Sequence, residues 1–302
     1  MEGLRDPEAG LSYPDMLRMP GEPVGRQAMA GLIGTMLAIV SYFVVVPLVT
    51  DAGNWLVWLV TDRVSDFTAF DLAAKSMQTP AGMFVRHLAL ACVILIAALV
   101  VAVFHRVRPR WLNSVQPGFR WRYAFICFAV SLVVMNLVLW AENGFQIGTI
   151  NPQPDFGWFL LVIFVTTPFQ AAAEEYLFRG YLLQSLTMIA RNKWAGVVVS
   201  AAIFAFFHAN GDLLIFGYRF GFGLLAGSLV VLTGGLEAAI AAHVVNNLCS
   251  FTYAALSTSV ASAIAVIQIT WVELVLPLAG FAICGALAVL IGRKLQVAVV
   301  TP

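Results

Sequence analysis

Long apolar runs dominate this chain of 302 residues. Hydrophobic residues make up 61% of the chain and charged residues only 11%, whereas soluble proteins carry about 25% charged residues. A helix needs about 20 mostly apolar residues to cross a bilayer. The runs of this kind cover 27–50, 83–105, 123–141, 157–190, 194–209, 213–232, 236–256 and 271–292. The sequence therefore predicts an all-α fold, a polytopic membrane helix bundle of about eight transmembrane helices.

The segments outside these runs suggest the domain organisation. Residues 1–26 are polar and rich in Pro and Gly, which is typical of a mobile tail. The first run is longer than the roughly 7–15 residue core of a signal peptide, so we expect it to remain as an anchor. The apolar stretch 54–60 is short and is interpreted as a re-entrant or interfacial piece, with Trp55 and Trp58 at headgroup level. The expected parts are a tail (1–26), N-terminal helices with a basic loop (27–122), a core (123–256) and a C-terminal helix with a short tail (257–302).

Charge placement predicts the orientation and excludes one class of partner. Basic residues follow alternate runs: Arg106, Arg108, Arg110, Arg120 and Arg122 after the second, Arg191 and Lys193 after the fourth, and Arg293 and Lys294 after the eighth. Because cytoplasmic loops carry an excess of Lys and Arg, we expect both termini to be cytoplasmic. The net charge of +1 argues against nucleic acid as a partner. The four cysteines form no C-x-x-C pair, so neither a disulfide framework nor a thiolate metal site is indicated.

Two adjacent glutamates interrupt the fourth run. A carboxylate at the centre of a bilayer costs at least about 2.5–3.5 kcal/mol, so Glu174 and Glu175 mark a buried site. Glu175 and Arg179 are four residues apart and can pair on one helix face. Glu174 points about 100° away from Glu175 and is available to another partner.

Further polar residues lie at a matching depth in later runs. At about 1.5 Å per residue, Glu174 is about 24 Å and His208 about 21 Å from the basic ends of their runs. His243 and Asn247 are four residues apart, share a helix face, and lie about 10 and 16 Å from the start of theirs. The Gly223/Gly227 spacing indicates close helix packing. We therefore expect Glu174, His208 and Asn247 to surround one cavity.

These motifs, in this order, resemble the type II CAAX prenyl endopeptidases and their bacterial relatives, the CPBP (CAAX protease and bacteriocin-processing, or Abi) membrane proteins. The residues that carry the resemblance are Glu174-Glu175-x-x-x-Arg179, Phe204-x-x-x-His208, Phe220-x-x-Gly223-x-x-x-Gly227 with Thr233-Gly234-Gly235-Leu236, and His243-x-x-x-Asn247. Gly235 stands where Ser or Asn is usual. The resemblance implies an intramembrane protease of a bacterial cytoplasmic membrane, with a cavity reached from the cytoplasmic side. The implied partner is a membrane-associated protein or peptide substrate in the lipid bilayer, whether prenylated or not.

Peptide hydrolysis needs an activated water molecule and donors for the developing oxyanion. We assign Glu174 as the general base and expect His208 to share the water. Asn247 and His243 are the expected oxyanion donors, a role worth about 10²–10³ in rate for one donor.

Two neighbouring residues have a supporting role in this interpretation. Glu175 and Arg179 hold the helix in register, and Arg179 is also a candidate anchor for a substrate carboxylate.

Three alternatives to this mechanism stay open. Glu174, His208 and His243 have the ligand count of a catalytic zinc site, although we expect no cofactor, because a water held by Glu and His needs no metal. A transporter would use the buried Glu and His residues as a proton relay, but transporters usually show interrupted helices in both halves, and here the polar residues lie in one half. A non-enzymatic membrane regulator or immunity protein is the third.

Overall fold

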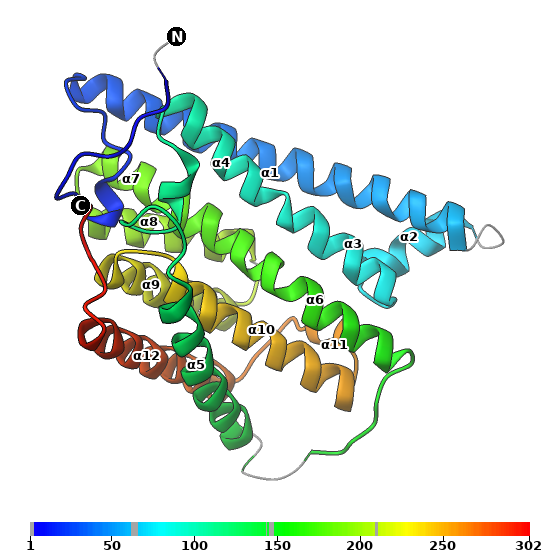
Figure 1. The fold of residues 1–302 in the computed structure, drawn as a ribbon. Coiled ribbons are helices and arrows are strands. Elements are labelled where there is room, and N and C mark those ends of the chain that lie inside the picture. The colour runs from blue at the N-terminus through cyan, green and yellow to red at the C-terminus, as the bar shows by residue number, and fades with distance from the viewer. Residues whose placement is uncertain (1–2, 62–65, 143, 145–147, 209–210) are drawn as a thin grey trace.

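The computed structural model describes residues 3–61, 66–142, 144, 148–208 and 211–302, and this part of the chain forms helices and no named strand. Figure 1 shows their arrangement. The helices are α1 (Val24–Thr61), α2 (Phe67–Lys75), α3 (Pro80–Ala91), α4 (Val93–Phe104), α5 (Trp121–Glu142), α6 (Phe156–Glu175), α7 (Leu183–Ala190), α8 (Lys193–Phe207), α9 (Leu213–Thr233), α10 (Glu237–Ser257), α11 (Val260–Ile264) and α12 (Trp271–Lys294). Short 3₁₀ segments cover Tyr13–Asp15 and Pro109–Leu112, and a π-helical segment, Tyr176–Leu182, joins α6 to α7.

Seven helical stretches among the described residues are long and apolar enough to cross a membrane, with α3–α4 and α6–α7 each counted as one. The predicted polytopic helix bundle is confirmed. The remaining apolar run forms α8, which is shorter, at 15 residues. Its predicted end at residue 209 falls outside the described residues.

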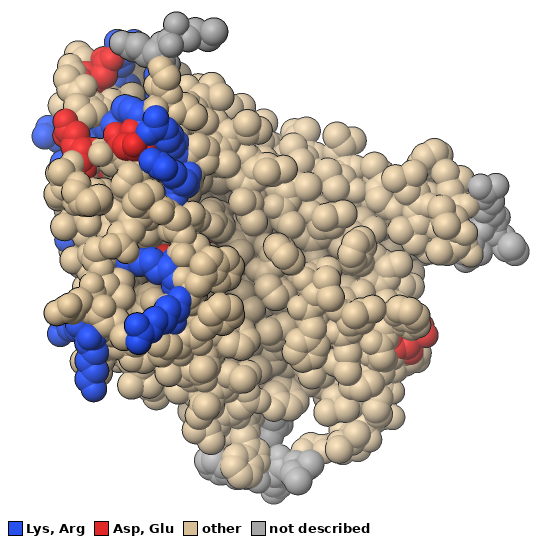
Figure 2. Space-filling model, in the orientation of Figure 1, with Lys and Arg blue, Asp and Glu red and all other residues tan. Residues whose placement is uncertain are grey.

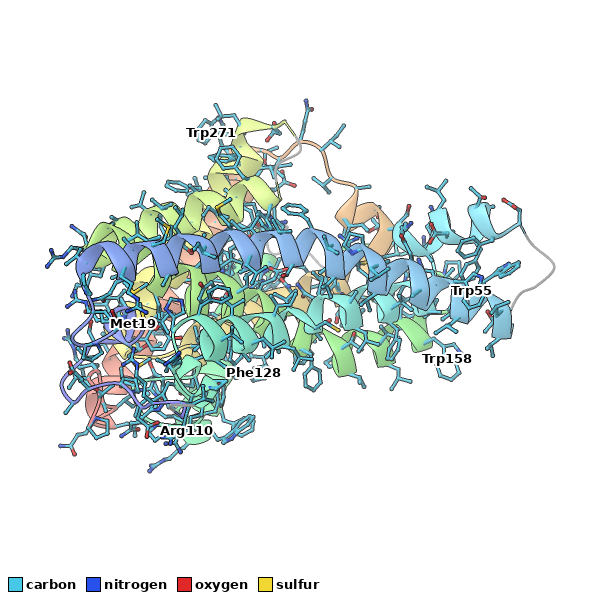
Figure 3. All side chains as sticks on the ribbon, turned by 90° about the horizontal axis from the view of Figure 1, so that it is seen from above. Met19, Trp55, Arg110, Phe128, Trp158 and Trp271 are labelled. Atoms are coloured by element: carbon cyan, nitrogen blue, oxygen red, sulfur yellow. The ribbon has the colours of Figure 1, made fainter. Side chains whose placement is uncertain are left out.

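The first helix corrects one expectation. The stretch 54–60 is not a re-entrant piece, because α1 continues without interruption through Trp55 to Thr61 over 38 residues. Asn54 explains part of this: its side chain is buried and its Nδ2 donates to Asp71 Oδ1 of α2 at 2.9 Å. Figure 3 shows Trp55 and Trp158 at the end of the bundle opposite to Met19 and Arg110.

The N-terminal segment is not a mobile tail in the structure. Tyr13, Met16 and Leu17 are buried and cover the ends of the helices. Trp111 Nε1 donates to the Asp6 carboxylate at 2.6 Å, which fastens the segment to the loop before α5. The apolar side chains at 13–17 supply the burial that a fully polar tail would lack.

The two ends of the bundle differ in charge. Both termini lie at one end, together with the connections α4–α5, α7–α8 and α9–α10 (Figure 1). The Lys and Arg side chains visible in Figure 2 gather there, so we call it the basic end. The connections α1–α3, α5–α6 and α10–α12 lie at the opposite end. Which end faces the cytoplasm stays a prediction.

The α8–α9 hairpin begins at the basic end. Its first helix, α8, is only about 22 Å long at 1.5 Å per residue and ends within the bundle. The two helices are in close contact: a Cβ on Gly223 would lie 2.7 Å from Ala201 Cβ. This confirms the packing role predicted for the glycine. The hairpin end therefore brings His208 to the middle of the bundle, beside α6 and α10.

Candidate functional site

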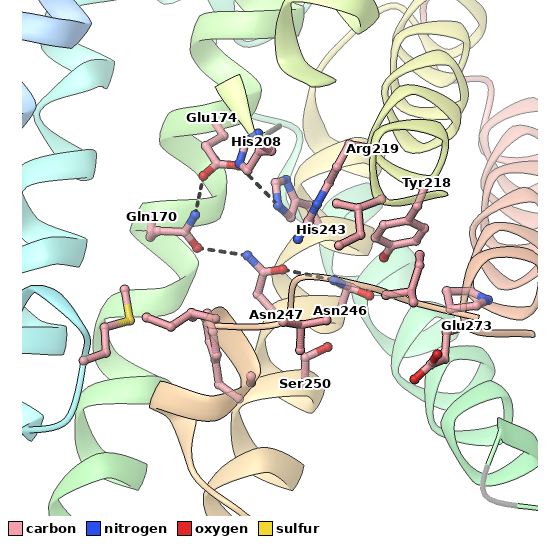
Figure 4. A pocket seen from close by; sticks show the side chains of 18 of the residues that line it. Gln170, Glu174, His208, Tyr218, Arg219, His243, Asn246, Asn247, Ser250 and Glu273 are labelled. Atoms are coloured by element: carbon pink, nitrogen blue, oxygen red, sulfur yellow. Dashed lines mark hydrogen bonds and ion pairs between the residues drawn. The ribbon is translucent and has the colours of Figure 1, made fainter. Parts of the chain in front are cut away.

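A cavity of about 580 Å³ lies between α3, α5, α6, α9, α10 and α12. Its polar wall contains the four residues predicted to be catalytic, Glu174, His208, His243 and Asn247, and Figure 4 shows them converging. The polar lining residues in the middle of the bundle are Gln170, Glu174, His208, Tyr218, Arg219, His243, Asn246, Asn247 and Ser250. The structure thus brings together residues that are distant in sequence, as in the Asn247–Gln170 contact, whose residues are 77 positions apart.

Glu174 is near the end of α6, with 8% of the residue exposed. Its Oε1 accepts a hydrogen bond from Gln170 Nε2 at 2.7 Å. Its Oε2 faces the two imidazoles, 3.6 Å from His243 Nε2 and 3.9 Å from His208 Nε2. One oxygen is therefore held in place, and the other points at the histidines.

Each histidine is oriented through its other ring nitrogen. His243 Nδ1 lies 2.8 Å from Glu175 Oε1, and His208 Nδ1 lies 2.9 Å from the carbonyl oxygen of Phe204. A carboxylate and a carbonyl only accept hydrogen bonds, so both Nδ1 atoms carry the proton. In the neutral rings both Nε2 atoms then present lone pairs toward Glu174. A water molecule has two protons to donate, so it can bond to any two of these three acceptors across the separations of 3.6 and 3.9 Å.

Asn247 reaches this group through Gln170. Asn247 Nδ2 donates to Gln170 Oε1 at 2.9 Å, and Asn246 Nδ2 donates to Asn247 Oδ1 at 3.0 Å. A chain of side-chain amides therefore runs from α10 to the Glu174 carboxylate. Gln170 was missed in the sequence, although a signal was present: it is polar, lies in an apolar run, and precedes Glu174 by four residues, which places both on one helix face.

The predicted contact between Glu175 and Arg179 is confirmed, with 2.9 Å between Oε1 and Nη1. Their side chains are 0% and 1% exposed. The Arg179 guanidinium lies 4.5 Å from the Phe204 ring centroid and 5.0 Å from that of Phe222. Arg179 is thus enclosed behind the cavity wall. Its expected second role, as an anchor for a substrate carboxylate, is not supported by this position.

The cavity opens at the end opposite to the basic end. Its exposed lining residues include Lys75 at the end of α2, Ala263 and Val266 between α10 and α12, and Glu273 at the start of α12. The cavity opening and the two termini therefore lie at opposite ends of the bundle. The expectation that both face the cytoplasm is wrong, because only one of the two ends can do so. The short helix α8 contributes to this arrangement, because it ends within the bundle beside His208 on the cavity wall.

The zinc alternative can be tested against the donor geometry. Two ligand atoms of a tetrahedral zinc lie about 3.3–3.5 Å apart, given bond lengths of about 2.0–2.2 Å. The separations from Glu174 Oε2 to His243 and His208, 3.6 and 3.9 Å, are wider. The described residues contain no group of three or more His, Cys, Asp or Glu that could hold a metal ion. The choice between a metal-dependent and a metal-free mechanism stays a prediction, and no step is assigned to a metal below.

Comparison with known proteins relates this region to a family. Residues 156–249 match the family model described as type II CAAX prenyl endopeptidase, Rce1-like, which confirms the resemblance over this part of the chain. One curated relative is the uncharacterized protein YyaK of Bacillus subtilis (strain 168). It is 26% identical over 149 residues, which make up 46% of this chain and 50% of YyaK. The chain thus matches half the length of that relative.

Proposed function

We propose that this chain is an intramembrane endopeptidase that hydrolyses a peptide bond of a membrane-associated protein or peptide, using a water molecule activated by Glu174 and His208. The observation that carries the proposal is the convergence of Glu174 Oε2 with two oriented imidazole nitrogens, at 3.6 and 3.9 Å, on the wall of an accessible cavity. The family match supports a peptidase at the level of the family. The apolar helices supply the membrane setting.

In the proposed mechanism the water lies between Glu174 and the two histidines. Glu174 Oε2 accepts a proton from the water as its oxygen attacks the carbonyl carbon, so that a C–O bond forms. The same carboxyl then returns the proton to the amide nitrogen as the C–N bond breaks. The products are a carboxylic acid and an amine. Gln170 fixes the carboxylate throughout by holding Oε1 at 2.7 Å.

We modify the proposed roles of the two oxyanion donors on the basis of their hydrogen bonds. Asn247 keeps the amide N–H groups that the role needs, and it reaches the oxyanion by exchanging its bond to Gln170 Oε1 for one to substrate. His243 donates its Nδ1 proton to Glu175, so its Nε2 can donate only when the ring carries a second proton. We therefore assign the donor role to Asn247 and let His243 hold the water.

Comparison of protein termini in membranes tests the proposal. Cells would produce the wild type, Glu174→Gln, or the control Asp155→Asn, which removes a carboxylate outside the cavity wall. We expect a set of new termini in membranes with wild type and Asp155→Asn, and their absence with Glu174→Gln. An identical set of termini in all three would contradict the protease and favour a non-enzymatic regulator.

The same preparation separates the water mechanism from the zinc alternative. We expect cleavage to persist in chelator at constant pH, and purified protein to hold far less than one zinc per chain. Stoichiometric zinc that is lost in His243→Ala, with cleavage restored only by added Zn²⁺ after chelation, would overturn the metal-free mechanism.

A further inference from the structure

A second arginine lies on the cavity wall, and the proposed mechanism gives it no role. Arg219 belongs to α9, and Figure 4 shows its side chain beside His243 and Tyr218. Its guanidinium carbon lies 5.3 Å from the Tyr218 ring centroid. Unlike Arg179, which is enclosed, Arg219 lines the cavity and can meet a ligand.

Arg219 has no acidic partner among the described residues. Its Nε is buried and has no hydrogen-bond acceptor in the part of the chain that the structure describes. Neither Glu142 nor Glu273, the other carboxylates that line the cavity, forms an ion pair with it. By contrast, Arg120 is paired with Glu237 at 2.7 Å. Within the described residues, the cavity therefore holds a cation whose donors are uncommitted.

An uncommitted guanidinium in the interior of a membrane protein marks a functional position. Arg cannot lose its proton in a protein, so the charge persists and its cost must be offset by a partner or by water. Its planar fork of N–H donors matches a carboxylate through two parallel hydrogen bonds. A peptide that reaches Glu174 from the open end passes this wall, and each extended residue spans about 3.3–3.6 Å. A carboxylate a few residues from the scissile bond is thus within reach.

We propose that Arg219 binds a carboxylate of the peptide substrate and so selects peptides that carry one near the scissile bond. This inference rests on the proposed peptidase function for its biological meaning. The carboxylate belongs either to the C-terminus of the peptide or to an Asp or Glu side chain. Arg219 holds the substrate, whereas Glu174 acts on it, so the two residues can be tested separately.

Binding, measured without cleavage, gives the first test. Purified Glu174→Gln protein is immobilised in detergent and exposed to a proteome-derived peptide library, either untreated or with all carboxyl groups amidated. We expect at least tenfold greater retention of the untreated peptides. Adding Arg219→Gln should abolish this preference while amidated peptides are retained as before, which shows that the cavity remains folded.

Arg86→Gln is the matched control, because Arg86 lines the same cavity from α3. Equal retention of both libraries, or a preference that survives Arg219→Gln, would overturn the proposal. So would an equal loss of preference in Arg86→Gln, because the effect would then come from the general positive potential of the cavity.

Synthetic versions of the retained peptides distinguish the two sources of the carboxylate. One set is amidated only at the C-terminus, and the other replaces Asp and Glu by Asn and Gln. Loss of retention in one set identifies the source, and loss in neither set overturns the proposal. Failure of the peptidase function has a different signature, namely the absence of Glu174-dependent termini in membranes, and it leaves the binding result intact.

Discussion

The buried pair of Glu175 and Arg179 should be worth more to stability than an exposed pair with the same spacing. Both side chains are almost completely buried, so Arg179→Met leaves an uncompensated carboxylate inside the protein. Removing one partner of a buried pair costs about 3–5 kcal/mol. We expect Arg179→Met and Glu175→Gln each to lower the free energy of unfolding by about that amount.

The double variant is the decisive measurement. Glu175→Gln with Arg179→Met removes both charges, and the Gln oxygen can still accept the proton of His243 Nδ1. What stays lost is the attraction of the guanidinium to the rings of Phe204 and Phe222, about 2 kcal/mol when desolvated. Contacts of the Met sulfur with the rings return about 0.3–1.5 kcal/mol. The double variant should therefore be at least about 1–2 kcal/mol more stable than either single variant.

Unfolding by SDS in mixed micelles, followed by tryptophan fluorescence, measures these differences. Glu22 and Arg26 provide the control, because they are also four residues apart and 2.9 Å from each other, but the Arg26 side chain is 72% exposed. Arg26→Met should change stability by less than about 1 kcal/mol. A double variant no more stable than Arg179→Met would refute the charge argument and assign the loss to packing around the two rings.

Three further predictions concern the site, its access and its pH dependence. Gln170→Leu should slow cleavage, because Glu174 Oε1 loses its hydrogen-bond donor at 2.7 Å. We expect a loss of about 10–100-fold, as is typical when a residue that orients a metal ligand is removed. An unchanged rate would show that Gln170 does not position Glu174. In intact cells, a membrane-impermeant thiol reagent should label Ala263→Cys at the cavity mouth and spare Lys294→Cys at the basic end, and the reverse pattern would refute the predicted orientation. Burial lowers the pKa of the His105 imidazole, just beyond α4, to about 4. The folded protein therefore favours the neutral ring. This contribution to the free energy of unfolding is complete above about pH 6.5, and about 3 kcal/mol of it is lost as the pH falls toward 4. His105→Gln should flatten the stability profile in that window, and an equal slope in both proteins would count against it.

Local spacing and depth predicted much of the polar centre from sequence. Glu175 and Arg179 pair because residues four apart on a helix are neighbours. The pairing survives although the backbone from Tyr176 to Leu182 is π-helical, which no pattern in the sequence indicated. Counting from the basic loops placed Glu174 and His208 at similar depths, and the structure brings their side chains within 3.9 Å. These predictions needed only the rise and rotation of a helix.

Predictions that depend on tertiary contacts were less successful. The polar composition of 1–26 suggested a mobile tail, but the burial of Tyr13 and Leu17 depends on surfaces supplied by distant helices. The sequence predicted a separate piece at the end of α1 because the apolar stretch 54–60 is short. The bond from Asn54 to Asp71 needs the position of α2, which sequence spacing does not give.

One imidazole, that of His243, contacts both of the adjacent glutamates, Glu174 and Glu175. His243 donates from Nδ1 to Glu175 and presents Nε2 to Glu174. The ion pair of Glu175 with Arg179 therefore also fixes the ring that faces Glu174, the proposed general base. A change at Arg179 therefore reaches Glu174 through a chain of direct contacts, without any change in the cavity wall itself. In the proposed mechanism this makes the position of the water depend on a pair that no substrate touches. It follows that Arg179 variants which still fold should bind peptide normally and cleave it slowly, whereas Arg219 variants should show weakened binding of carboxylate-bearing peptides.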